Sequence, residues 1–332
     1  MFANPMVIAL MGGAVMTTAF MLYATGVGVQ ILCCWNRASA SEAQLSLERK
    51  TYLVSSILLQ VVGVQMLTFF LFILTVDRLH ELFTGAMCAA GTLNANAYGY
   101  PVMGLKLAGF IGSGLWLIIR HVDAKAPDYP LIRIQYGLLC AVCVIWCFET
   151  FYLFRYFAAL YPQIITSCCG TIFGNSGEGL AAETAHLSIS VIRPGFWGLL
   201  VATLAAGAMF FRTRKGDWIF ALLGTLMLPV SLAALISYIC LYFYELPTHH
   251  CPFCLLQKEY SHVGYLLYAS LLTGGVAAMG VGMLGWFKQY QSLRVIVPAC
   301  QKRLSLVSIA GYAVFAVTAG YPMVFSDFML LG

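Results

Sequence analysis

Eight separate runs of mostly apolar residues, each about long enough to cross a lipid bilayer as a helix, dominate this sequence. A transmembrane α-helix needs about 20 consecutive apolar residues. Hydrophobic residues make up 61% of the chain and charged residues only 9%, whereas a soluble domain usually carries roughly a quarter charged residues. The sequence therefore predicts an all-α fold, a polytopic membrane bundle of about eight transmembrane helices. The predicted spans are 6–34, 52–76, 102–119, 134–157, 195–211, 218–244, 262–287 and 304–325.

Basic residues in the connections predict the orientation of the chain. Four of the connections hold 13 of the 18 lysine and arginine residues, and they alternate with the three others along the chain. Lysine and arginine are enriched in cytoplasmic loops. We therefore predict that these four connections are cytoplasmic and that both termini lie on the outer, exoplasmic face. The expected location is the inner (cytoplasmic) membrane of a prokaryote.

We expect residues 1–332 to form a single membrane domain with three parts along the chain. The first part is a three-span segment, 1–133, and the second is a four-span segment, 134–287. The last part, 288–332, holds a cytoplasmic loop and the final span.

Two groups of cysteines can be distinguished among the twelve on this topology. Three of them recur on one face of the fourth span, where cysteine packs as a small apolar residue between helices. The second group lies in outer loops, and thiols in an oxidising compartment either pair as disulfides or have a redox or metal-binding role. This outer group consists of Cys88, Cys168, Cys169, Cys251 and Cys254.

The most informative stretch is 249–254, with the sequence HHCPFC, which we expect to open the seventh span. Two cysteines three positions apart can form a small-loop disulfide, and a helix N-terminus stabilises a thiolate. Pro252 suits the first turn of a helix, and His249 and His250 can shuttle protons. These features are typical of a thiol–disulfide exchange centre, with Cys251 and Cys254 as the catalytic pair.

Two other uses of the same motif stay open. Two cysteines at this spacing also occur as a plain structural disulfide. Histidine and cysteine within one turn also suit zinc or copper. If the motif binds a metal, the expected ligands are His249, His250, Cys251 and Cys254.

The segment 134–287 resembles the membrane four-helix thiol oxidoreductases of the vitamin K epoxide reductase type, which are functionally akin to the bacterial DsbB proteins. The resemblance rests on a long outer loop with Cys168 and Cys169, followed after two spans by the CxxC motif. In those families the CxxC exchanges electrons with a quinone, and loop cysteines relay them to a soluble thioredoxin-like partner. The resemblance therefore implies a quinone cofactor and a relay role for Cys168 and Cys169.

The two loop cysteines are adjacent in this chain, in contrast to that family. Consecutive Cα atoms lie about 3.8 Å apart, below the usual disulfide range of roughly 4.4–6.8 Å. We therefore expect one of them to pair elsewhere, and Cys88 and Cys251 are the candidate partners.

A quinone site needs an apolar slot and a proton donor or acceptor near the reactive sulfur. We expect His249, His250, Glu259 and His262 to supply the proton-transferring groups, with the last two following the motif on its own helix. Structural ion pairs are the alternative role for these residues.

A covalent c-type haem is excluded on this pattern, because Leu255 rather than histidine follows Cys254.

Ionisable residues within predicted spans are functional candidates by default, and Glu149 and Lys106 are examples. Glu149 lies in the outer half of the fourth span. Lys106 lies just inside the third span, from where its side chain can extend to the interface.

Three functions compete on this sequence. The leading one is a membrane thiol–disulfide or quinone-linked oxidoreductase. The second is a membrane-anchor subunit of a larger respiratory or electron-transfer complex, whose outer cysteines would dock a cytochrome or an iron–sulfur protein. The third is transition-metal transport or handling. Membrane lipid surrounds the chain in all three, and no sequence feature indicates nucleic acid binding.

Overall fold

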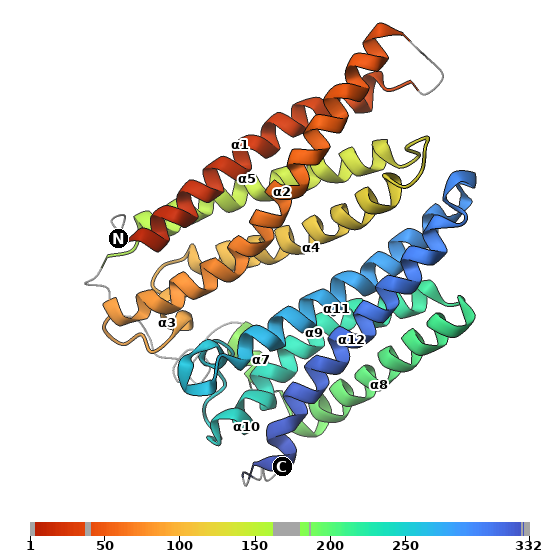
Figure 1. Ribbon diagram of the computed structural model, residues 1–332. Coiled ribbons are helices and arrows are strands. Elements are labelled where there is room, and N and C mark those ends of the chain that lie inside the picture. Colours follow the sequence, from red (N-terminus) through yellow and green to blue (C-terminus); the bar gives the residue numbers. More distant parts are fainter. Residues whose placement is uncertain (1–3, 37–40, 162–179, 186, 327, 329–332) are drawn as a thin grey trace. The chain divides into compact units, whose positions relative to one another are not determined.

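A computed structural model describes residues 4–36, 41–161, 180–185, 187–326 and 328 (Figure 1). The described residues form helices and connecting turns, and no strand occurs among them. A π-helical turn, Leu235–Ile239, joins α9 to α10. The α-helices are α1 (Pro5–Cys34), α2 (Glu42–Leu79), α3 (Ala89–Leu93), α4 (Gly99–Asp123), α5 (Ile132–Ala158), α7 (Leu180–Ala185), α8 (Ile189–Thr213), α9 (Asp217–Ala234), α10 (Cys240–Tyr244), α11 (Val263–Gly285) and α12 (Ile296–Phe325).

Eight helical segments of the described chain are long and apolar enough to cross a membrane, which confirms the predicted number of spans. Each predicted span lies within one observed segment or differs from it by a single residue. The main difference is length, because α2 begins at Glu42, ten residues before the predicted span. The polar residues at the N-terminal end of α2 are also helical, because the backbone hydrogen bonds of an α-helix form between polar residues as well as apolar ones.

The helix ends have local causes that can be read from the sequence. At the start of α1, the Asn4 side chain accepts a hydrogen bond from the backbone of Met6, and Pro5 occupies the first turn. Both are typical features of a helix N-terminus. Between α8 and α9, Arg214 and Gly216 adopt positive φ angles of 61° and 81°, which reverse the chain within three residues.

The described chain divides into two compact units. Unit 1 contains α1, α2 as far as Val76, α4 and α5. The helix α5 packs against both α1 and α4 (Figure 1). The core of unit 1 includes three large side chains with no exposed surface, Trp116, Tyr136 and Trp146.

Unit 2 contains α8, α9, α10, α11 and α12, together with the segment Asp77–Thr92. The helix α9 packs against α8 and α11 (Figure 1). Close approach of α11 to α9 depends on glycine: a Cβ added at Gly275 would lie 2.6 Å from Leu228, and one at Gly282 would lie 2.4 Å from Ala221. Small residues at such contacts are typical of membrane helices, because they let backbones approach closely.

The four-span segment 134–287 is shared between these units. The helix α5 belongs to unit 1, whereas α8, α9 and α11 belong to unit 2. Packing thus groups the first of these four spans with α1 and α4, although it is adjacent in sequence to the others.

The prediction that the CxxC motif opens the seventh helix is wrong. Cys251 and Pro252 lie in a loop, and Cys254 begins a short 3-10 turn, Cys254–Leu256. The helix α11 starts only at Val263. Ser261 and His262 have positive φ angles of 54° and 55°, which right-handed helical residues do not adopt. The two cysteines are therefore not at a long helix N-terminus.

Candidate functional site

Three cysteine side chains of unit 2 meet in a buried cluster, which we call the thiol cluster. It consists of Cys88, Cys251 and Cys254, whose sulfur atoms all lie within 4.8 Å of one another. Cys88 Sγ and Cys251 Sγ lie 3.4 Å apart. Exposed fractions of the three residues are 0%, 0% and 4%. Residues 163 positions apart in sequence thus form one site that is shielded from solvent.

The short segment before α3 positions Cys88. The backbone N–H of Ala89 donates to the carboxylate of Asp77, at the end of α2, over 3.3 Å. The side-chain amide of Gln257 donates to the carbonyl of Met87 over 2.9 Å. The first contact fixes this segment to α2, and the second fixes it to the loop that carries the motif.

Two tyrosine hydroxyls hold the motif loop in place. Tyr244, at the end of α10, donates a hydrogen bond of 2.5 Å to the carbonyl of Cys251. Tyr268, on α11, donates one of 2.6 Å to the carbonyl of Pro252. Both tyrosines are largely buried, so these bonds satisfy backbone carbonyls that water cannot reach. The loop is irregular but fixed from both sides.

His249 is the histidine that contacts the thiol cluster. Its Nε2 atom lies 3.3 Å from Cys254 Sγ, and its ring packs edge-on against Tyr244 with centroids 4.4 Å apart. Burial lowers the pKa of His249 from its usual value, opposed in part by nearby Cys88. The imidazole is therefore neutral near pH 7, the state in which a ring nitrogen accepts a proton or binds a metal.

The other predicted proton-transferring residues contact the protein backbone or solvent. His250 Nδ1 donates to the carbonyl of Ile236 over 2.8 Å, and His262 Nδ1 donates to that of Leu256 over 2.6 Å. Glu259 is exposed in a 3-10 turn, not on the helix predicted for it. These contacts attach the motif loop to its neighbours. The predicted relay cysteines, Cys168 and Cys169, lie outside the described residues.

The donor set fits a metal ion as well as a disulfide. Three sulfur atoms and one imidazole nitrogen are the ligands of a tetrahedral Cys₃His site. Zinc–sulfur bonds of about 2.3 Å imply sulfur–sulfur distances of about 3.8 Å in a tetrahedron. This value lies between the 3.4 Å separation of the Cys88 and Cys251 sulfurs and the 4.8 Å limit of the cluster. The grouped donors therefore differ from the expected ligand set, because Cys88 joins Cys251 and Cys254. His249 contacts Cys254 from beside this group, and His250 faces the Ile236 carbonyl instead.

A second polar cluster lies in the core of unit 1 and was anticipated only in part. Lys106 Nζ and Glu149 Oε1 form an ion pair of 2.7 Å, with side chains 2% and 1% exposed. Gln65 donates to both Glu149 oxygens, and Thr17 donates to Gln65. Thr68 accepts a further hydrogen bond from Lys106. The expected extension of Lys106 to the interface is wrong, since its ammonium group is paired inside the bundle.

Sequence comparison adds no assignment to this geometry. No family model, curated protein or solved structure matches the chain.

Cys88 is the residue of the thiol cluster that the sequence did not mark as a site residue. The sequence predicts only that it is one of the outer cysteines and a candidate partner for Cys168 or Cys169. The signal that could have found it is the predicted topology, which puts Cys88 and the motif in outer loops of the same face. Spacing could not pair them, because 163 residues separate Cys88 from Cys251.

Proposed function

We propose that this chain is a membrane thiol–disulfide oxidoreductase centred on Cys88, Cys251 and Cys254. The observation that carries the proposal is the thiol cluster itself, with three sulfur atoms within 4.8 Å. Thiol–disulfide exchange needs an attacking thiolate and a disulfide in contact. A third sulfur beside a CxxC pair meets this need without a large rearrangement of the chain.

The exchange step moves one bond between the three sulfurs. The thiolate of Cys88 attacks Sγ of Cys251 in a Cys251–Cys254 disulfide. A Cys88–Cys251 bond forms, the Cys251–Cys254 bond breaks, and Cys254 leaves as a thiolate with the electron pair of that bond. The neighbouring imidazole of His249, 3.3 Å away, stabilises this thiolate by donating a hydrogen bond from Nε2.

Net oxidation of the cluster needs an external acceptor. Two thiols that become one disulfide lose two electrons and two protons, and a quinone that takes both is reduced to a quinol. A membrane-dissolved quinone suits a site at 0–4% exposure better than a bulky soluble thiol does, because the sulfurs are covered by protein. The electron donor would be a dithiol of a thioredoxin-like partner.

Mass-tag alkylation of the purified chain tests this proposal. Reduced protein incubated anaerobically with a soluble quinone analogue should gain one disulfide and yield one quinol per chain. In Cys254→Ser, oxidation should trap a Cys88–Cys251 disulfide, detectable by peptide mass spectrometry. Cys34→Ser, an exposed cysteine of α1, serves as the matched control and should behave as wild type. Cys251 and Cys254 that stay reduced in native membranes and form no quinol would rule out the redox role.

A second candidate is transition-metal handling, and the position of His249 favours it. Its imidazole Nε2 lies 3.3 Å from Cys254 Sγ and offers a nitrogen donor beside the three sulfur atoms. Soft thiolate ligands favour zinc or copper(I).

Elemental analysis of the purified protein separates the two candidates. The metal role predicts about one zinc or copper ion per chain, lost in Cys88→Ser and weakened in His249→Ala. His250→Ala is the control that should keep the metal, because that side chain faces the Ile236 carbonyl. Metal-free protein that forms the disulfides described above supports the redox role and excludes this one.

A further inference from the structure

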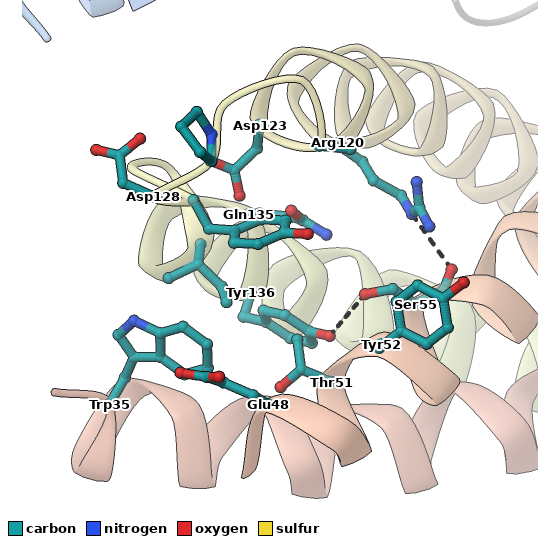
Figure 2. A pocket seen from close by; sticks show the side chains of 14 residues that line it. Trp35, Glu48, Thr51, Tyr52, Ser55, Arg120, Asp123, Asp128, Gln135 and Tyr136 are labelled. Atoms are coloured by element: carbon teal, nitrogen blue, oxygen red, sulfur yellow. Dashed lines mark hydrogen bonds between the residues drawn. The ribbon is translucent and has the colours of Figure 1, made fainter. Parts of the chain in front are cut away.

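A cavity of about 520 Å³ lies in unit 1, among residues that are not part of the thiol cluster (Figure 2). It is built at the end of the unit where α1 and α4 end and α2 and α5 begin, the end that the basic loops predict to be cytoplasmic. Its walls come from the end of α1, the first half of α2, the end of α4 and the start of α5. Small-molecule sites typically have volumes of about 300–1,000 Å³, so the cavity is large enough for a ligand.

Two residues that line this cavity carry side-chain polar groups for which no hydrogen bond to the described residues is seen. Gln135 is 4% exposed, and Figure 2 shows its amide reaching into the open space beside Arg120. Trp35 is 7% exposed, and its indole Nε1 is buried without a partner. Buried polar groups are almost always hydrogen-bonded in proteins. The Gln135 amide therefore offers hydrogen bonds to a polar occupant of this cavity.

Charged side chains of both signs line the cavity. Arg120 uses only its Nε atom within the described chain, to donate to the carbonyl of Ser55 over 3.2 Å. The terminal nitrogens of its guanidinium group have no partner there. Figure 2 shows Arg120 on one side and Asp128 on the opposite side, with the Asp123 carboxylate between them in this view. Glu48 adds a third carboxylate to the lining.

Each part of the lining recognises a different chemical group. A guanidinium with two free nitrogens binds a phosphate or carboxylate. Carboxylates bind a protonated amine, and the oxygen of the Gln135 amide can accept a hydrogen bond from the same amine. The indole N–H of Trp35 needs an oxygen acceptor.

We propose that this cavity binds a small zwitterion that carries a primary ammonium and a phosphate or carboxylate group. The ammonium group lies toward Asp123, Glu48 and the Gln135 amide, and the anionic group lies at Arg120. A phosphatidylethanolamine headgroup and a free amino-phosphate or amino acid share this chemistry. A simple anion is disfavoured, since three acidic residues and one arginine line the cavity. The inference does not depend on the redox proposal, because none of these residues belongs to the thiol cluster.

Binding measurements on the full-length chain test the proposal with two probes. Calorimetric titration with O-phosphoethanolamine tests the free zwitterion. Native mass spectrometry after incubation in mixed phosphatidylethanolamine–phosphatidylglycerol nanodiscs tests the lipid source. Gln135→Leu removes the amide at similar volume, and Arg120→Gln removes the guanidinium. Arg49→Gln is the control, because it removes an exposed cation of α2 that does not line the cavity.

The site is supported if wild type and Arg49→Gln bind either probe. Gln135→Leu and Arg120→Gln should then bind that probe with affinity at least tenfold lower. Binding of the soluble probe identifies a free zwitterion, and selective retention of phosphatidylethanolamine alone identifies a lipid headgroup. Phosphocholine, which lacks the N–H donors, should bind more weakly than phosphoethanolamine. Unchanged thermal unfolding of both variants confirms that they fold. Absence of binding to both probes, or equal binding by all variants, overturns the proposal.

Discussion

Tyr244 shows how a single side chain can fix the geometry of the thiol cluster. Its hydroxyl donates to the carbonyl of Cys251, and its ring contacts the rings of His249 and Tyr260, with centroids 4.4 Å and 4.7 Å away. The residue thus touches both the motif and the histidine beside it. At this scale, function depends on neighbours of the cysteines as much as on the cysteines.

Tyr244→Phe should destabilise the motif loop. The substitution leaves the buried carbonyl of Cys251 without its donor, which costs about 1–3 kcal/mol. We expect a lower midpoint of unfolding in detergent and faster alkylation of Cys251 and Cys254. Tyr260→Phe is the matched control, since no described hydrogen bond involves its hydroxyl. Equal alkylation rates in the two variants would show that the Tyr244 bond does not hold the loop.

The buried ion pair of unit 1 predicts a difference between single and double substitutions. Lys106→Met leaves the Glu149 carboxylate buried and unpaired, which should cost about 3–5 kcal/mol of unfolding free energy. Lys106→Met combined with Glu149→Gln removes both charges and keeps an amide that can bond to Gln65. Denaturant unfolding should therefore find the double variant more stable than Lys106→Met alone. A double variant that is as unstable as the sum of both single variants contradicts electrostatic coupling.

At the scale of elements, α11 has two distinctive features. Its glycines make close contacts with neighbouring helices, and its first residue, Val263, lies well beyond the CxxC motif. Glycines on α11 meet α9 and α12, and a Cβ at position 311 of α12 would lie 2.8 Å from the carbonyl of Ser270. The chain between Cys254 and Val263 uses two 3-10 turns, Cys254–Leu256 and Lys258–Tyr260, before the helix begins. The apolar pattern predicted a span here but not where its first turn begins.

Gly282→Ala should weaken the packing of α11 on α9. The added Cβ would lie 2.4 Å from the Cβ of Ala221, which forces the helices apart at a cost of about 1–3 kcal/mol. Gly198→Ala, on α8, is the control, because no atom lies within 4 Å of an added Cβ there. A second substitution, Ala221→Gly, should restore most of the stability lost in Gly282→Ala. Thermal unfolding in detergent measures all three, and a failure of the rescue would place the effect elsewhere.

At the scale of the whole molecule, eight membrane-spanning segments are distributed over two compact units. The units do not follow the order of the predicted parts, because α5 joins unit 1 and the segment Asp77–Thr92 joins unit 2. Because the segment Asp77–Thr92 belongs to unit 2, Cys88 lies in the same unit as the CxxC motif. Whether the chain acts alone or as a membrane-anchor subunit is tested by purification in mild detergent followed by the quinone assay.

The predicted orientation has a direct test at this scale. A membrane-impermeant maleimide applied to intact cells should label Thr248→Cys, an exposed position in the loop of the motif. Arg214→Cys, in the basic connection between α8 and α9, should react only after the membrane is permeabilised. A chain with native residues at both positions gives the background from its own cysteines. The reversed labelling pattern would show that both termini are cytoplasmic.

The sequence by itself determined the number, approximate bounds and helical nature of the spans. This succeeded because a transmembrane segment must satisfy its backbone within one helix and face lipid with apolar side chains, and both demands are local in sequence. It also marked Cys251, Cys254 and His249, which lie within six residues of one another.

Only the tertiary structure decided which residues from different elements come into contact. Cys88 meets the motif, Lys106 meets Glu149, and Gln135 faces a cavity with Arg120, because helix packing brings together residues far apart in the chain. Packing also moved the start of α11 beyond the motif, since Tyr244 and Tyr268 bind the motif carbonyls in an irregular loop. Contacts of this kind depend on three-dimensional approach, which spacing along the sequence does not encode.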